Sequence, residues 1–136
     1  MPRFLLTGGA GFIGSNLVRF LLEKGNEIVV FDNFSTGKRE NLQEIAYQIE
    51  VKEGDLRDLP AVTQSMQECD GVFHLGALGS VPRSIADPET TTQVNAMGTF
   101  NVLQAARQTG VKRIVFSGSS SAYGDQPVSP KVETMP

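Results

Sequence analysis

The chain has 136 residues, which is enough for one folded domain and too few for two. Its formal net charge of −3 argues against a nucleic acid or an anionic membrane as a partner recognised through bulk positive charge. A single cysteine and a single histidine exclude a disulfide framework and a Cys- or His-rich metal centre, so no metal site is expected. No signal peptide and no run of about 18 apolar residues occurs, so the expected location is the cytoplasm.

Short apolar segments of high strand propensity alternate along the chain with segments that suit helices. The expected strands are Arg3–Thr7, Glu27–Asp32, Ile49–Gly54, Gly71–Leu75 and Arg113–Ser117. The expected helices are Gly11–Glu23, Arg39–Tyr47, Pro60–Glu68 and Pro88–Thr109. Residues 118–136 contain three prolines and no periodic pattern, and we expect them to form a loop.

This alternation predicts an α/β fold. Strands separated by helices pair in parallel through right-handed crossovers, and continuous apolar strands suit a sheet that is covered on both faces. We therefore predict a doubly wound parallel sheet with the strand order 3-2-1-4-5, contained in one domain over residues 1–136. A doubly wound sheet usually continues beyond a fifth strand, so this domain is expected to be incomplete.

A glycine-rich turn joins the first expected strand to the first expected helix. Gly9, Gly11 and Gly14 satisfy the pattern G-x-G-x-x-G, and Gly8 with the last two satisfies G-x-x-G-x-x-G. Asp32 ends the second strand 18 residues after Gly14, close to the spacing found in dinucleotide-binding proteins. The plain alternative is a turn that only connects two elements. The Lys-Ser/Thr pair of a P-loop is absent, and the context favours dinucleotide binding.

The type of dinucleotide depends on the charge beside the adenosine ribose. The carboxylate of Asp32 can accept hydrogen bonds from the ribose hydroxyls and would repel a 2′-phosphate, which favours NAD. Lys38 and Arg39 lie close by in the sequence and would favour NADP if they faced the ribose. The alternative is that both are solvated charges at the start of a helix. NAD is the expected cofactor.

Several segments occur together in an order typical of one family. They are TGGAGFIGSNLV, VFDNFSTGKREN, EGDLRD, VFHLGALGSVPRSIADP, NAMGTFNVLQAA and VFSGSSSAYGDQPVSPKVETMP. With them the chain resembles the extended short-chain dehydrogenases/reductases, in the NAD-dependent nucleotide-sugar epimerase/dehydratase group. It is most similar to UDP-N-acetylglucosamine 4-epimerases, followed by UDP-glucose/galactose 4-epimerases. Gly79 stands where the galactose type commonly carries lysine, which favours the N-acetylhexosamine type or a broader range of sugars.

The resemblance implies a Rossmann-type NAD site along the carboxyl ends of the strands. The residues that it implies are Gly8, Gly11, Phe12, Ile13 and Gly14 at the pyrophosphate, Asp32, Asn33, Ser35, Thr36 and Gly37 at the ribose, Asp55 and Leu56 at the adenine, and Leu75, Gly76, Ala77, Leu78, Asn95 and Ser117 elsewhere along the cofactor. Simpler roles remain open for three residues. Asp55 could cap a helix, Asn95 could satisfy a buried carbonyl, and His74 is expected to be a hydrogen-bonded core residue.

For the substrate, the resemblance implies a UDP-sugar, contacted by a serine-rich loop after the fifth strand. Ser119 would be catalytic, because the family places a Ser or Thr at this spacing before Tyr-Gly, where it bonds the reacting sugar hydroxyl. Gly79, Ser80, Ser120 and Ser121 would also contact the substrate, with Arg83 a weaker candidate. The implied reaction is 4-epimerisation through transient oxidation of the sugar at carbon four.

The family's catalytic base lies in a Tyr-x-x-x-Lys motif that this chain lacks. Val51 follows Tyr47 at the lysine position, and Pro127 follows Tyr123. We therefore expect the chain to be the N-terminal portion of such an enzyme, limited on its own to NAD binding. A nucleotide-sugar dehydratase and a non-catalytic NAD-binding module are the alternatives. An uncovered fifth strand also predicts a homodimer or other self-association, through Arg113–Ser117 and the helix Pro88–Thr109.

Overall fold

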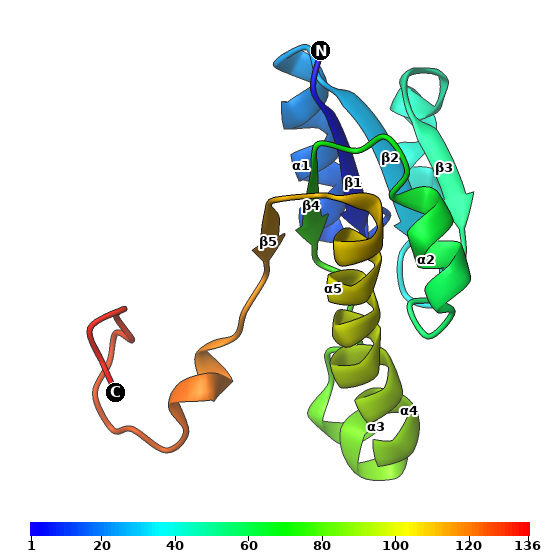
Figure 1. Ribbon diagram of the computed structural model, residues 1–136. Helices are drawn as coiled ribbons and strands as arrows, with labels where there is room; N and C mark the ends of the chain where they lie inside the picture. Colours follow the sequence, from blue (N-terminus) through cyan, green and yellow to red (C-terminus); the bar gives the residue numbers. More distant parts are fainter.

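The computed structural model describes all 136 residues and contains one five-stranded parallel sheet in the order β3-β2-β1-β4-β5 (Figure 1). Its strands are β1 (Arg3–Thr7), β2 (Glu27–Asp32), β3 (Glu50–Glu53), β4 (Gly71–His74) and β5 (Ile114–Phe116). The predicted α/β fold and strand order are confirmed, and β1 and β2 have the predicted bounds. β3, β4 and β5 are each shorter than predicted by one or more residues.

The helical segments follow the predicted order with four differences, one of which is a short 3₁₀ helix at Ser120–Tyr123 within the expected loop 118–136. The segments are α1 (Phe12–Glu23), η1 (Arg39–Gln48), α2 (Leu59–Ser65), α3 (Val81–Ala86), α4 (Pro88–Thr92), η2 (Gln93–Met97), α5 (Gly98–Thr109) and η3 (Ser120–Tyr123). The segment η1 is a 3₁₀ helix, and η2 is a π-helical turn between α4 and α5. The helix α3 was not predicted, although Ser80 caps its first turn by accepting from the Arg83 N–H.

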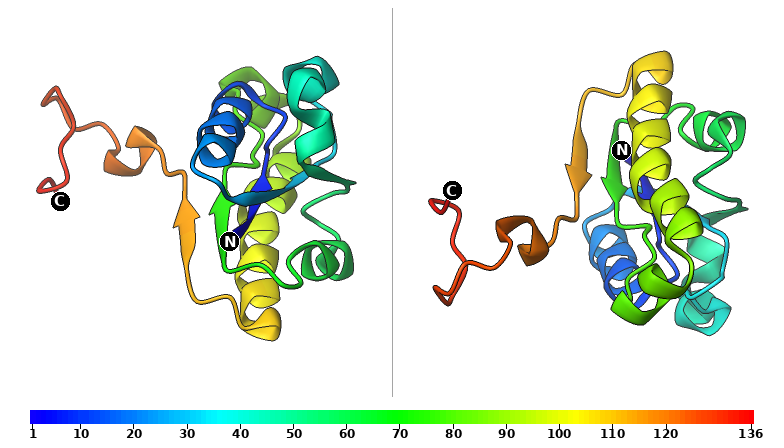
Figure 2. Two further views of the ribbon diagram at one scale, coloured as in Figure 1. Left: turned by 90° about the horizontal axis from the view of Figure 1, so that it is seen from above. Right: turned by 90° about the horizontal axis from the view of Figure 1, so that it is seen from below.

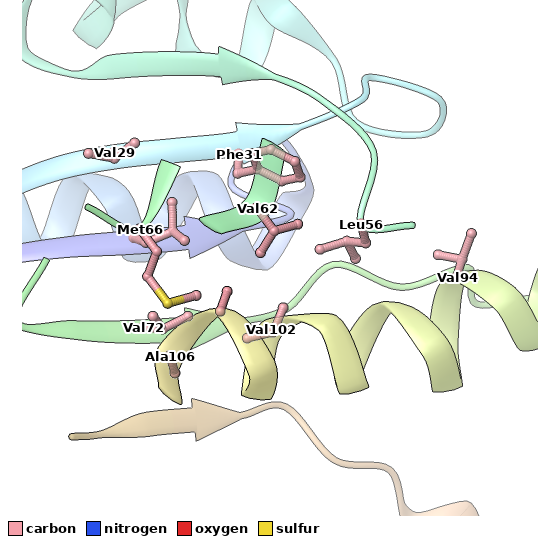
Figure 3. Packing of buried hydrophobic residues seen from close by; sticks show 11 residues of the cluster. Val29, Phe31, Leu56, Val62, Met66, Val72, Val94, Val102 and Ala106 are labelled. Carbon is pink, nitrogen blue, oxygen red and sulfur yellow. The ribbon is translucent and has the colours of Figure 1, made fainter. Parts of the chain in front are cut away.

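Helices cover both faces of the sheet. Successive strand residues point to opposite sides, so a strand of consecutive apolar residues presents apolar side chains on both faces. Leu5 of β1 belongs to the core under α2 and α5, whereas Leu6 belongs to the core under α1 and η1. Figure 3 shows the first core, to which Val102 of α5 and Met66, the residue directly after α2, both belong. Both of these side chains are fully buried. The two cores hold the carboxyl ends of the strands together at one edge of the domain.

The two outer strands of the sheet differ in character. β3 carries charged side chains, and its Lys52 pairs with Glu50 at 2.6 Å. β5 is apolar, and its Val115 and Phe116 are half-exposed or more. Beyond β5 the chain leads away from the sheet, as both views of Figure 2 show. None of the helices is both long enough and apolar enough to span a membrane.

Candidate functional site

A cleft of about 380 Å³ lies at the carboxyl ends of β1, β2, β3 and β4. In a doubly wound sheet this is where ligands bind, beside the point at which the strand order reverses. Here that point lies between β1 and β4. The cleft is lined by Gly8, Gly11, Phe31, Asp32, Asn33, Ser35, Thr36, Gly37, Gly54, Asp55, Leu56, Arg57, Leu75, Gly76, Ala77, Leu78, Arg83, Thr90 and Val94.

The glycine-rich turn forms the floor of this cleft. Gly8 has a φ of 71°, and a Cβ there would lie 2.7 Å from the backbone nitrogen of Gly76. A Cβ on Gly14 would lie 2.2 Å from the carbonyl oxygen of Gly8, so the first turn of α1 packs against the end of β1. A Cβ on Gly11 would approach only the Gly8 oxygen, at 3.4 Å. The turn therefore presents bare backbone to the cleft at Gly11.

The start of α1 is also free to receive an anion. The helices α2 and α4 have side-chain caps, from Asp58 and Asp87, whereas the N-cap residue of α1 is Gly11, which has no side chain to cap the helix. The first N–H groups of a helix have no intrahelical partner, and they bind phosphate well. The side chains of Phe12 and Ile13 are 82% and 62% exposed and do not line the cleft. Of the turn and the first residues of α1, only Gly8 and Gly11 line the cleft.

Asp32 is held rigidly at the end of β2. Its Oδ2 accepts from the Ala10 N–H at 3.0 Å, and its Oδ1 accepts from the Phe34 N–H at 2.9 Å. A Cβ on Gly37 would lie 3.1 Å from Oδ2, so the loop after β2 closes tightly over the carboxylate. Each oxygen keeps a further lone pair for a hydroxyl group. Asp32 is thus a preorganised acceptor that lines the cleft.

Of the two basic residues near this carboxylate, Arg39 is engaged elsewhere. The guanidinium of Arg39 lies 4.0 Å from the centre of the Phe34 ring and forms an ion pair with Glu53. Neither Arg39 nor Lys38 lines the cleft. The positive charge of Arg39, which could have favoured a 2′-phosphate, is therefore partly neutralised by Glu53.

A second carboxylate lies after β3. Asp55 accepts from Arg57 Nε at 2.9 Å through Oδ1 and from Arg57 Nη2 at 2.7 Å through Oδ2. These hydrogen bonds from Arg57 lower the pKa of Asp55 to about 2. Asp58, and not Asp55, caps α2, so the alternative role considered for Asp55 is not observed. The sequence analysis did not identify Arg57, which lines the cleft beside Asp55.

The segment Leu75–Leu78 forms the wall of the cleft after β4. The side chain of Asn95 holds this wall by accepting from the Leu78 N–H at 2.7 Å and donating to the Leu78 carbonyl at 2.9 Å. Asn95 itself does not line the cleft. Of its two expected roles, the structure therefore shows backbone support. The π-helical turn η2 contains Asn95, and such turns often occur at functional sites.

His74 lies in the core behind this wall, as expected, and is only 2% exposed. Burial lowers the pKa of His74 to about 4, whereas an unfolded histidine titrates near 6.5. On acidification the unfolded chain therefore binds a proton at this residue before the folded chain does. The free energy of unfolding that depends on His74 is fully present above about pH 6.5 and declines as the pH falls towards 4.

We expect this single residue to cost about 2 kcal/mol of stability between pH 7 and pH 5. Because His74 is the only histidine, no other side chain with an ordinary pKa titrates in that window. Urea unfolding of the wild type and of His74→Gln at both pH values measures the effect. The variant should be less stable at pH 7 but should lose much less on acidification. Equal losses in the two proteins would contradict the assignment.

The serine-rich loop lies outside the cleft in this structure. The Ser117 N–H donates to the His74 carbonyl at 3.1 Å, which continues the pairing of β5 with β4. Ser119 caps η3 by accepting from the Ser121 N–H at 3.1 Å, and Ser120 and Ser121 are exposed. The cleft is not lined by Ser117, by Gly79 and Ser80, or by Ser119, Ser120 and Ser121. The cleft brings together the proposed cofactor residues except Phe12, Ile13, Gly14, Asn95 and Ser117, and of the proposed sugar residues it includes only the weaker candidate Arg83.

Five further residues line the cleft without having been singled out from the sequence: Phe31, Gly54, Arg57, Thr90 and Val94. Gly54 carries a signal that could have revealed it, since it immediately follows a strand. A Cβ on Gly54 would lie 2.6 Å from Cε2 of Phe31. Thr90 of α4 and Val94 of η2 belong to the helical connection between β4 and β5, and they come to the cleft only when this connection folds back over the sheet. The weaker candidate Arg83 also lines it.

Comparison with known proteins agrees with this geometry. The model of the NAD dependent epimerase/dehydratase family matches residues 4–136, so the chain belongs to that family. A UDP-glucose 4-epimerase from Streptomyces lividans is 39% identical over 98% of this chain and 41% of its own length. The chain thus spans about two fifths of this relative.

Solved structures show the same relation. A UDP-glucose-4-epimerase from Stenotrophomonas maltophila, with bound NAD and formylated UDP-arabinopyranose, superposes with a TM-score of 0.91 at 33% identity. The match covers 98% of this chain and 42% of that one. A dTDP-glucose 4,6-dehydratase from Streptomyces venezuelae, with NAD bound, superposes with a TM-score of 0.90 at 34% identity over 98% of this chain and 44% of that one. The chain corresponds to the N-terminal part of such enzymes.

Proposed function

We propose that this chain binds NAD in the cleft and forms the cofactor-binding part of a UDP-sugar 4-epimerase. The observation that carries the proposal is the meeting, in one cleft, of the bare Gly8–Gly14 turn with the immobilised carboxylate of Asp32. Epimerases similar to this chain act on UDP-sugars, as their names state. The proposed substrates are UDP-GlcNAc/GalNAc or UDP-glucose/galactose.

The residues in the cleft fit the parts of a dinucleotide in order. Asp55 is ionised and held by Arg57, so it can accept from the amino group of adenine. Asp32 can accept from the ribose hydroxyls, and the start of α1 at Gly11 can receive the pyrophosphate. When bound, NAD would supply reversible hydride acceptance at carbon four of the sugar. The wall Leu75–Leu78 would then shape the path towards the sugar.

The choice of an epimerase over a dehydratase rests on the serine-rich loop. Dehydratases in this family tend to carry an Asp-Glu pair where this chain has Ser120 and Ser121. A hydroxyl cannot replace a carboxylate as the acid and base of an elimination near neutral pH. Ser119 is proposed to bond the reacting sugar hydroxyl. Because Ser119 lies outside the cleft in this structure, that contact would require the loop to approach it.

Calorimetric titration of the chain with NAD, in the presence and absence of UDP-GlcNAc or UDP-galactose, tests the proposal. We expect saturable, one-to-one binding of NAD. A chain that is folded by circular dichroism but does not bind NAD at millimolar concentration would refute the cofactor role. Conversion of dTDP-glucose to a 4-keto-6-deoxy sugar, by this chain or by a longer protein that contains it, would instead support the dehydratase.

Asp32→Ala should weaken NAD binding by roughly tenfold or more and reduce the preference of the chain for NAD over NADP. The carboxylate is expected both to bind the ribose and to repel a 2′-phosphate, and its loss also frees the Ala10 and Phe34 N–H groups. Both cofactors are titrated against wild type, Asp32→Ala and Asp32→Asn. The Asn variant keeps the size of the side chain and removes its charge, together with one of the two oxygens that accept from the Ala10 and Phe34 N–H groups. An unchanged NAD/NADP ratio in both variants would remove Asp32 from the specificity role.

A further inference from the structure

A chain of hydrogen bonds passes through the buried ring of His74. The Gly76 N–H donates to Thr7 Oγ1 at 3.1 Å, and Thr7 Oγ1 lies 2.6 Å from His74 Nδ1. On the other side of the ring, His74 Nε2 lies 2.9 Å from Thr99 Oγ1. Thr99 Oγ1 in turn donates to the Asn95 carbonyl at 2.7 Å. These contacts link β1, β4, η2 and α5 behind the cleft.

The chemistry of these groups determines where each proton lies. A carbonyl oxygen only accepts, so the Thr99 hydroxyl proton points to Asn95, and Thr99 Oγ1 must accept from His74. His74 therefore carries its proton on Nε2. A neutral imidazole has only one N–H, so Nδ1 accepts the hydroxyl proton of Thr7, and Thr7 accepts from Gly76. Burial keeps the ring neutral by lowering its pKa to about 4.

One end of this chain of hydrogen bonds reaches the wall Leu75–Leu78 directly, and the other ends at the backbone carbonyl of Asn95, whose side chain holds the wall. Thr7 holds the wall at Gly76, and Asn95 holds it at Leu78 through two hydrogen bonds of its side-chain amide. The wall is thus held near its start and at its end. His74 is the side chain that joins the two points of attachment.

We propose that His74 is a positioning residue whose Nε2–H tautomer couples the two attachments of the wall, so that together they set the shape of the NAD cleft. The proposal rests on the proposed role of the cleft in NAD binding. Neither His74 nor Thr99 lines the cleft. Any effect of their hydrogen bonds on NAD must therefore pass through the wall.

The tautomer can be measured without any cofactor. In a two-bond ¹H–¹⁵N spectrum of the chain labelled at histidine, all ring signals belong to His74, because it is the only histidine. At pH 7 we expect one dominant species, protonated at Nε2 with an acceptor Nδ1. A dominant Nδ1–H form, or two tautomers in rapid exchange, would overturn the proposal. A simple packing role for the ring would not select one tautomer.

The coupling is tested with variants that are matched in shape. Thr99→Val removes the hydroxyl and keeps the branched side chain, whereas Thr99→Ser keeps the hydroxyl. We expect Thr99→Val to weaken NAD binding about tenfold and to shift the amide signals of Gly76 and Leu78, and Thr99→Ser to restore both towards wild type. NAD affinity within twofold of wild type in Thr99→Val, with the amide signals unmoved, would overturn the proposal.

A double-mutant cycle then separates one network from two independent attachments. Thr7→Val breaks the attachment at Gly76, and we expect Thr7→Val/Thr99→Val to weaken NAD binding by clearly less than the product of the two single effects. If the loss of NAD affinity in the double variant equals the product of the two single losses, the attachments are independent and the proposal is overturned. Where a valine variant does not fold, the tautomer of wild-type His74 decides. If the wild type shows the expected tautomer but does not bind NAD, the proposed function is refuted, whereas the assigned tautomer of His74 stands.

Discussion

Gly14→Ala is expected to weaken NAD binding by at least about 100-fold. The new Cβ would lie 2.2 Å from the Gly8 carbonyl oxygen and 2.8 Å from the Cα of Gly9. Both neighbours are backbone atoms in a tight turn, so neither can rotate away as a flexible side chain would. The turn or the helix α1 must shift, and either movement displaces the N–H groups proposed to hold the pyrophosphate. Titration calorimetry with NAD measures the loss.

Gly118→Ala is the matched control for this substitution. A Cβ on Gly118 would approach only the ring of Phe116, at 3.9 Å, and Gly118 lies outside the cleft. We expect its NAD affinity and its melting temperature to equal those of the wild type. Binding by Gly14→Ala within fivefold of this control would show that the close packing of the turn is not required for the cofactor.

The second large effect concerns turnover. We expect the 136-residue chain to convert UDP-galactose or UDP-GlcNAc roughly 10²–10⁴-fold more slowly than the Streptomyces lividans epimerase under the same conditions, because general acid–base catalysis typically contributes that much. Neither tyrosine of the chain has a lysine four residues later to lower its pKa, since Val51 and Pro127 occupy those positions. Chromatography of the UDP-sugars after incubation with NAD measures the conversion.

A binding assay on the same preparation provides the control for this prediction. NAD affinity within the range of the longer relative, together with little turnover, would show that the cofactor site is intact and the catalytic base is missing. Turnover comparable to that of the relative would contradict the prediction. Another group in the chain would then have to remove the proton of the 4-hydroxyl.

The sequence predicted the sheet well, because local signals mark its strands. Apolar runs ended by Gly or Asp defined β1 and β2 to the residue, and the alternation with helices predicted the strand order. The helix α3 was missed because it buries no residue and therefore shows no apolar periodicity. The π-helical turn η2 was also missed. The hydrogen bond of its residue Asn95 to Leu78 joins residues that are 17 positions apart, and no local sequence pattern marks such a contact.

The candidate site was likewise predicted where local signals mark its residues and missed where contacts between distant residues define them. The glycine-rich turn and the wall Leu75–Leu78 follow strands directly, Asp32 is the last residue of β2, and the cleft brings them together. Arg57 lacked a motif of its own, and its role depends on the folded position of Asp55. Ser119 lies on a loop that leads away from the sheet, so its spacing from Tyr123 does not determine what it contacts.

The two edge strands of the sheet differ in how readily each would pair with an added strand. At β3 an added strand would meet the charged side chains of Glu50 and Lys52, which oppose edge-to-edge pairing. At β5 it would meet Ile114, Val115 and Phe116, with an outer row of backbone groups that no strand covers. We therefore expect an added strand to pair with β5 more readily than with β3.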